Sequence, residues 1–273
     1  MTDTRYRKHF FYFLLAIFLA AGCWLLAAKC FAQNELKDYQ YQSEQYRQTY
    51  DTYIKARDAY LTYETLTSRD ELIAATRNFL YARAITLRTY FQVLKKELKQ
   101  APDVESSQKT NLILNLDSQI NWLMDSEKEI QNLQNPTLDD LLEVSKRFER
   151  NQKDYSKLAY QTLSNIILGK MRLLQSEAMS INFLLADKIN ANGHPKDPIT
   201  LNQWLETVKN MAYQSQKSIE QAEAYLAELN ESSGNKDNFG SYKNIQQELE
   251  KAKYQLISAI DYQKEILREV ESE

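Results

Sequence analysis

The chain has 273 residues, which is enough for one large domain or two modest ones. It contains five glycines and four prolines and has a formal net charge of −3, so long helices are favoured over strands, and a concentrated basic face for nucleic acid is not expected. Both cysteines, Cys23 and Cys30, lie near the N-terminus, which excludes disulfides, zinc–thiolate sites and thiol catalysis from the body that follows.

The N-terminal region predicts a membrane segment. Residues 10–28 carry no charged side chain, and they follow the basic residues Arg5, Arg7 and Lys8. A helix needs about 20 residues to cross the hydrocarbon core of a bilayer, so this run is long enough to span it. The basic flank predicts a cytoplasmic N-terminus and an extracytoplasmic body. We therefore interpret residues 1–32 as a signal anchor or a signal peptide, with the membrane bound through residues 10–28.

Three fates of this segment remain open. An uncleaved anchor gives a single-pass membrane protein. Cleavage near Ala32, after the small-x-small sequence Cys30-Phe31-Ala32, releases a secreted body. Lipidation at Cys23 is the third possible fate, because Leu19–Cys23 resembles a lipobox. Two features differ from a usual lipobox: Ala20 stands where a bulkier aliphatic residue is common, and apolar residues continue after the cysteine.

Apolar residues at three-and-four spacing predict six helices in the body, separated where most of its glycines and prolines fall. The expected ranges are 35–66, 69–100, 106–134, 138–190, 200–230 and a last helix from 241 nearly to the C-terminus. Ser68 with Glu71, and Thr137 with Asp140, have the spacing of helix N-caps.

The predicted fold is all-α: an N-terminal hydrophobic helix followed by an elongated six-helix antiparallel bundle or coiled-coil rod. The long helix 138–190 changes the phase of its apolar stripe near Gly169, its only internal glycine. We interpret this helix as shared between two bundles. Residues 33–165 would form a four-helix bundle, and residues 166–273 a three-helix coiled-coil bundle.

The last two helices show the clearest seven-residue repeat, which predicts that they pack as antiparallel neighbours. The expected seam of the last helix is Tyr242, Ile245, Leu249, Ala252, Leu256, Ala259, Gln263, Ile266 and Val270. That of the preceding helix is Leu201, Trp204, Val208, Met211, Ser215, Ser218, Ala222, Tyr225 and Leu229. The later stripe of the long helix includes Ile167, Met171, Ala178 and Leu185.

Tyrosines mark one face of the first helix. Five of them fall within an arc of roughly 80° at about 100° per residue: Tyr39, Tyr46, Tyr50, Tyr53 and Tyr60. We interpret the stripe as core side chains whose hydroxyls reach a bundle edge or a polar partner. A stacking platform for sugars or aromatic ligands is the alternative.

Two arginines fall at expected core positions. Arg57 lies within the tyrosine stripe, and Arg83 lies on the apolar arc of the second helix. A buried guanidinium needs acceptors, for which Glu64 and Glu97 are candidates. The arginines are interpreted as a polar layer that fixes helix register. Alternatively Arg57 and Arg83, with Tyr53 and Tyr60, would bind a small anion inside the first bundle.

Catalytic and metal-binding patterns are not found in the sequence. The one histidine of the body, His194, lies in a loop, and phosphate-binding glycine loops and nucleophile elbows are missing. We therefore expect no catalytic residues, metal ligands or cofactor. The predicted function is a membrane-anchored extracytoplasmic helical protein with a structural or protein-interaction role and a protein partner. The alternative is an extracytoplasmic ligand-sensing bundle.

Overall fold

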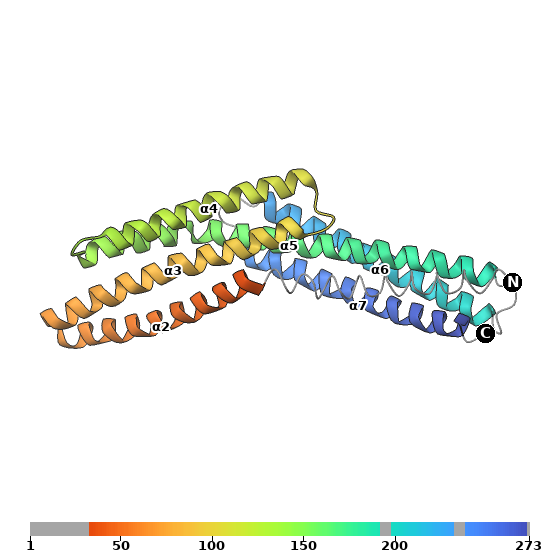
Figure 1. Cartoon of the computed structure of the whole chain (residues 1–273), viewed down its shortest axis with the longest axis horizontal. Helices are drawn as coiled ribbons and strands as arrows, with labels where there is room; N and C mark the ends of the chain where they lie inside the picture. The colour runs from red at the N-terminus through yellow and green to blue at the C-terminus, as the bar shows by residue number, and fades with distance from the viewer. Residues whose placement is uncertain (1–32, 192–197, 232–237, 272–273) are drawn as a thin grey trace. The chain divides into compact units, whose positions relative to one another are not determined.

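The computed structural model describes residues 33–191, 198–231 and 238–271, which form six α-helices and no strand (Figure 1). The helices are α2 (Gln33–Tyr63), α3 (Leu66–Gln100), α4 (Ser106–Asn132), α5 (Leu138–Ala191), α6 (Pro198–Glu231) and α7 (Asn238–Glu271). The all-helical bundle prediction is confirmed for these residues, and each predicted helix is present with ends that agree to within a few residues.

The predicted membrane segment, residues 10–28, lies outside the described residues, as does the whole of residues 1–32. None of the helices α2 to α7 combines the length and the apolar character that a membrane crossing requires.

The turn between α2 and α3 differs from the predicted capping box of Ser68–Glu71. Glu64 adopts a left-handed conformation with φ of 49°, and its N–H donates to the carbonyl of Tyr60 at 2.9 Å. The Oγ1 of Thr65 accepts the N–H of Ser68 at 3.1 Å, and the Oγ of Ser68 accepts the N–H of Thr65 at 3.1 Å. The N-cap is therefore Thr65, because its hydroxyl serves the same purpose one turn earlier.

The predicted cap of α5 is confirmed. The Oγ1 of Thr137 accepts the N–H of Asp140 at 3.2 Å, while a carboxylate oxygen of Asp140 accepts the N–H of Thr137 at 2.8 Å and its hydroxyl at 2.7 Å. These hydrogen bonds from Thr137 lower the pKa of Asp140. The pair thus satisfies two donors at the helix N-terminus, where a negative charge is also favourable.

The described chain divides into two compact units. Unit 1 contains residues 33–96 and Ile120–Leu141, and unit 2 contains Glu97–Gln119 and residues 142–271. The chain therefore passes between the units within α3, α4 and α5, so that each of these helices contributes to both.

In unit 1 the buried apolar side chains lie on α3, α4 and the start of α5, and α2 packs on α3 from outside this core. The ring of Phe79 on α3 is surrounded by Tyr46, Tyr50 and Tyr53 of α2, with ring centroids 5.2–5.5 Å away. Residues 34–63 are all exposed or half-buried, so no side chain in this range of α2 is fully buried. The helix is held by one half-covered aromatic face, by a hydrogen bond from Thr86 to the carbonyl of Gln42 at 2.9 Å and by the ion pair of Glu35 with Lys96.

In unit 2 the second half of α5 runs beside α6 and α7 (Figure 1), and the three helices share two apolar clusters. The first cluster includes Leu168, Ile219, Ala222, Leu226, Leu229, Ile245, Leu249 and Ala252. The second includes Leu185, Ile189, Leu201, Leu205, Val208, Ala259, Ile266 and Val270. Burial of these side chains is the main source of stability for the three helices.

The predicted seam of α7 is confirmed, since all nine of its residues are buried. The predicted seam of α6 is half correct. Its positions 201, 208, 215, 222 and 229 are buried, but 204, 211, 218 and 225 are half-buried, and the following residues at 205, 212, 219 and 226 are buried instead. The nine buried positions of α6 are spaced by four and three in turn, so they form one stripe as narrow as that of α7, and the predicted register is off by one residue at every second position.

One buried side chain in the α7 seam is polar. Gln263 is 1 % exposed, and its Nε2 donates to the carbonyl of Ala178 on α5 at 2.6 Å. Its Oε1 is buried and accepts no hydrogen bond from the described residues. An amide in this setting costs stability, because one of its polar atoms has lost water without gaining a partner.

Gly169 lets the loop after α3 approach the backbone of α5. A Cβ atom added at Gly169 would lie 2.1 Å from the carbonyl oxygen of Pro102 and 3.0 Å from a methyl group of Val104. Next to it, Arg172 donates from Nη1 to the carbonyl of Asp103 at 3.1 Å and pairs with Glu223 of α6 at 2.7 Å. The glycine is therefore explained by close packing of the loop on α5.

Candidate functional site

A groove of about 770 Å³ lies between α5 and α7 in unit 2, and we refer to it as the α5–α7 groove. Ile167 and Met171 of α5 and Leu249 of α7 line it, and residues 243–255 of α7 supply its other wall. Ile167 and Met171 pack against the core cluster that contains Leu249. These three residues extend the hydrophobic core to the floor of the groove, and most of the other lining residues are polar.

The charged residues of the groove are mainly basic. Lys243, Lys251 and Lys253 line it together with a single acidic residue, Glu250. Lys253 pairs with Glu250 at 3.3 Å, and Lys251 pairs with Glu248 at 2.6 Å. The lining residues alone thus carry a positive balance, which favours an acidic binding partner.

Tyr254 gives the groove an exposed aromatic ring. Its side chain lines the groove and is 70 % exposed, and Ile257, one turn further along α7, is also exposed. Both residues lie outside the buried seam of α7. Tyrosine is enriched at protein interfaces because its ring buries a large area while its hydroxyl makes a hydrogen bond.

The tyrosine stripe of α2 packs against α3. The ring of Tyr53 stacks on Phe79 with an interplanar angle of 13°, and Tyr39 contacts Tyr90 at 5.4 Å. Tyr60 is half-buried. The aromatic contacts of the stripe are thus made largely with α3, but none of the five tyrosines is fully buried and Tyr50 is 43 % exposed, so they do not form the expected core stripe.

The two arginines lie in different environments. Arg57 is not in a core: its side chain is 44 % exposed, and it pairs with Asp58 at 3.0 Å instead of with the expected Glu64. This pairing raises the pKa of Arg57. Arg83 lies half-buried on α3, and Glu97 pairs with Lys170. Arg57 is exposed because α2 contacts α3 through only one side, and an anion site at these residues stays a prediction.

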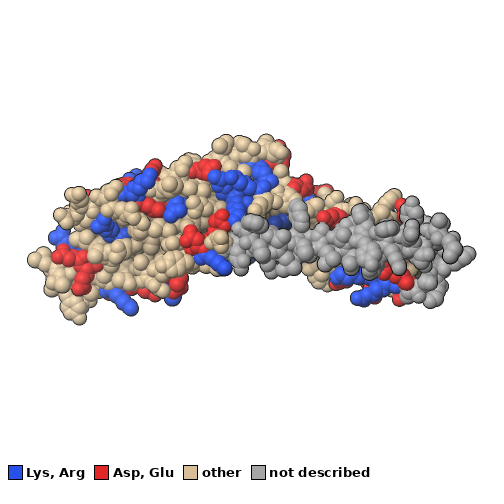
Figure 2. Space-filling view, in the orientation of Figure 1, with Lys and Arg blue, Asp and Glu red and all other residues tan. Residues whose placement is uncertain are grey.

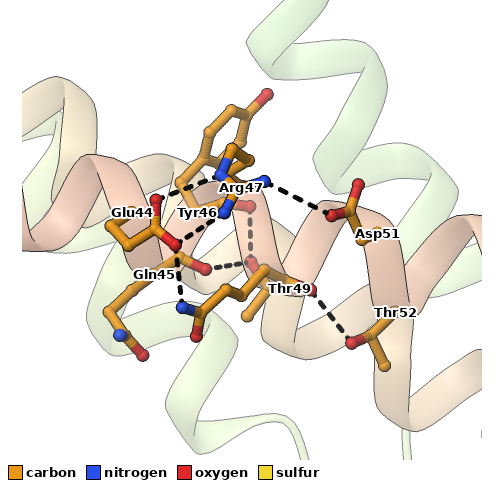
Figure 3. A network of polar contacts seen from close by, with 8 residues as sticks. Glu44, Gln45, Tyr46, Arg47, Thr49, Asp51 and Thr52 are labelled. Carbon is orange, nitrogen blue, oxygen red and sulfur yellow. Dashed lines mark hydrogen bonds and ion pairs between the residues drawn. The ribbon is translucent and has the colours of Figure 1, made fainter.

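The outward side of α2 carries a chain of contacts within the helix (Figure 3). Arg47 donates to both carboxylate oxygens of Glu44, at 3.0 and 2.8 Å, and lies 4.0 Å from Asp51. Gln48 also donates to Glu44, at 2.9 Å. The hydrogen bonds from Arg47 and Gln48 lower the pKa of Glu44 to about 2. These contacts support the helix locally and leave no group arranged for chemistry.

Features typical of metal centres are missing from the described residues, where no group of three or more histidine, cysteine, aspartate or glutamate side chains is placed to hold a metal ion. On the face shown in Figure 2, acidic and basic side chains are interspersed over the described surface.

Comparison with protein-family models, with curated proteins and with solved structures finds no match for this chain.

Sequence analysis missed the α5–α7 groove. Its apolar residues Ile167, Met171 and Leu249 were each predicted within an apolar stripe, but periodicity on separate helices does not reveal a gap between them. A usable signal was available in α7: Tyr254 and Ile257 fall off the predicted seam, beside several lysines. Large apolar side chains that a seam leaves outside are candidates for a binding surface.

Proposed function

We propose that this chain is a membrane-anchored helical protein with a protein-interaction role, held through residues 10–28 with its body outside the cytoplasm. The uncharged run and its basic N-terminal flank support the anchor and the orientation. The α5–α7 groove supports the interaction role.

The groove is the observation that carries the proposal, and it favours an amphipathic helix as the partner element. A groove between two helices accepts the apolar face of a third helix, whose side chains would contact the half-buried Ile167 and Met171 and the exposed Tyr254. Lys243, Lys251 and Lys253 would then face acidic residues at the edge of that helix. The proposed partner is therefore a protein that presents an acidic amphipathic helix.

Photo-crosslinking tests the groove directly. A photoreactive phenylalanine analogue is placed at Tyr254 in the full chain and irradiated in membranes of the native cells. The matched control places the analogue at Tyr213, which is exposed on α6 outside the groove. We expect a discrete protein adduct from position 254, and loss of this adduct when Met171→Asp is added.

Two results would overturn the interaction site: equal adducts from positions 254 and 213, or an adduct at 254 that survives Met171→Asp. Circular dichroism of the Met171→Asp variant shows whether it keeps its helices, so that a lost adduct is not confused with unfolding. If Met171→Asp unfolds, Lys253→Glu, which reverses an exposed charge, is used instead.

The anchor is tested by the intact mass of the protein taken from its native membrane. The uncleaved chain, a chain cut near Ala32 and a chain lipidated at Cys23 differ in mass and are separated by one measurement. An uncleaved mass in the membrane fraction supports the anchor, whereas a cleaved mass in the soluble fraction contradicts it.

A further inference from the structure

A second surface of unit 2 lies on the C-terminal half of α5, away from the α5–α7 groove. Gln175, Ser176, Met179, Ser180, Phe183 and Leu184 line a shallow hollow of about 540 Å³. Phe183 is 66 % exposed and Met179 is 38 % exposed, although Ala178 and Leu185 on the same helix are buried. We refer to these six residues as the α5 face.

The α5 face has charged residues of opposite sign at its two ends. Arg172 lies one turn before Ser176, and the exposed Asp187 lies one turn after Phe183. At about 100° per residue, Arg172, Ser176, Phe183 and Asp187 fall within an arc of roughly 60°, and Met179 and Ser180 lie at its two sides. One stripe of α5 thus runs from Arg172, which pairs with Glu223 of α6 at 2.7 Å, across a middle of small polar and large apolar residues, to the acidic Asp187.

The positions of this stripe form mirrored pairs about the midpoint between Met179 and Ser180. Arg172 and Asp187 are equally distant from that midpoint along the chain, and so are Ser176 and Phe183, and Gln175 and Leu184. When two copies of the helix pair in antiparallel fashion about a two-fold axis at this point, the large Phe183 of each copy meets the small Ser176 of the other. Each basic end then approaches an acidic end.

We propose that the α5 face is a self-association surface that takes a second copy of this chain, with the two α5 helices antiparallel. Symmetric dimers use the same patch on both subunits, which must be self-complementary, and the α5 face meets this condition in both shape and charge. The small serines at 176 and 180 allow close approach, and Phe183 fills the space that Ser176 leaves. Arg172 keeps its bond to Glu223 and adds attraction across the dimer.

The contact is small, because it involves a few turns of one helix from each copy. Specific interfaces of standard size bury about 1,600 Å² in total, and smaller ones are characteristic of weak or transient association. We therefore expect a reversible dimer with a dissociation constant in the micromolar range.

Cysteine crosslinking tests the pairing and its register. The full chain is purified in detergent with Cys23→Ser and Cys30→Ser, and a single cysteine is introduced by Ser180→Cys or, as the matched control, by Ser176→Cys. In the proposed dimer the two copies of residue 180 are offset by about 1.5 Å along the helix axes, whereas the two copies of residue 176 are offset by about 10 Å. A disulfide requires Cβ atoms about 3.8 Å apart.

We expect mild oxidation to crosslink the Ser180→Cys variant at least tenfold more than the Ser176→Cys variant. Equal crosslinking at the two positions, or greater crosslinking at 176, would overturn the antiparallel register. A second arm measures self-association of the full chain by light scattering over a range of concentrations, where Phe183→Glu is expected to weaken the dimer at least tenfold.

The control for this second arm is Tyr213→Glu, which changes an exposed aromatic residue of α6 outside both surfaces and should leave self-association unchanged. A chain that is monomeric at all concentrations, or a dimer insensitive to Phe183→Glu, would overturn the proposal. Because the two surfaces share no residues, this result is independent of the outcome of photo-crosslinking at Tyr254.

Discussion

Replacing Gly169 by alanine tests the packing of the α3–α4 loop on α5. Helix propensity alone predicts a gain of about 1 kcal/mol from this change in the middle of a helix. Packing predicts the opposite, since the new methyl group would lie 2.1 Å from the carbonyl oxygen of Pro102. That oxygen belongs to the backbone and cannot rotate away as a side chain can.

The size of the loss follows from what must move. Relieving the clash displaces the loop by more than 1 Å, because a carbon–oxygen contact normally spans more than 3 Å. Overpacking of this kind costs about 1–3 kcal/mol. Displacement of the loop also weakens the hydrogen bond from Arg172 to the carbonyl of Asp103, and a bond to a charged donor contributes about 1.5–3 kcal/mol. After subtraction of the propensity gain, we expect a net loss of about 1.5–5 kcal/mol.

Urea unfolding followed by circular dichroism measures this difference. The matched control is Ser176→Ala, an exposed position two turns along the same helix, where we expect a gain of a few tenths of a kcal/mol from helix propensity. If Gly169→Ala is as stable as the unaltered chain, or more so, the close approach of Pro102 to α5 does not exist in solution and the reasoning is refuted.

Three further expectations follow from the packing and the charges. Phe79→Ala removes the ring on which three tyrosines of α2 pack. We expect the free energy of unfolding to fall by about 2–3 kcal/mol and hydrogen exchange in α2 to become faster, and unchanged exchange would contradict this. The pKa of Glu44 is lowered from 4.5 to about 2, so its carboxylate stabilises α2 fully above pH 4.5, and this stabilisation is lost as the pH falls from 4.5 to 2. Glu44→Gln should therefore make the hydrogen-exchange protection of α2 less dependent on pH in that range. An unaltered pH dependence would argue against the contact with Arg47. Gln263→Leu removes a buried oxygen that has no partner, and we expect a gain of about 1 kcal/mol in urea unfolding; a loss of that size would show that the amide is satisfied in solution.

Much of the fold was predictable from the sequence because the deciding interactions are local. The helix ranges follow from apolar spacing and from a few residues such as Pro136 and Thr137, whose effects extend over one turn. The seam of α7 was predicted completely, since one continuous stripe of that helix is buried. In α6 every second seam position is shifted by one residue, because apolar side chains stand at both 204 and 205, and at both 211 and 212, and spacing alone does not decide which of each pair is buried.

The site was less predictable because it depends on which helices meet. Arg57 was expected in a core on the basis of its position among tyrosines, but the arc it shares with them is only half covered by α3. The α5–α7 groove depends on the distance between two helices, which no periodicity encodes. The α5 face could have been found from the sequence, since Met179 and Phe183 stand outside the predicted stripe of the long helix.

The shallow attachment of α2 has a mechanical consequence. Its 31 residues span about 46 Å as a helix and up to about 105 Å as an extended strand of chain. Since no side chain of residues 34–63 is fully buried, pulling on the chain ahead of Gln33 would peel α2 from α3 before it disturbed the densely packed bundle of α6 and α7. The unfolded helix would then lengthen the chain between residue 33 and α3 by about 60 Å while the rest of the molecule stayed folded.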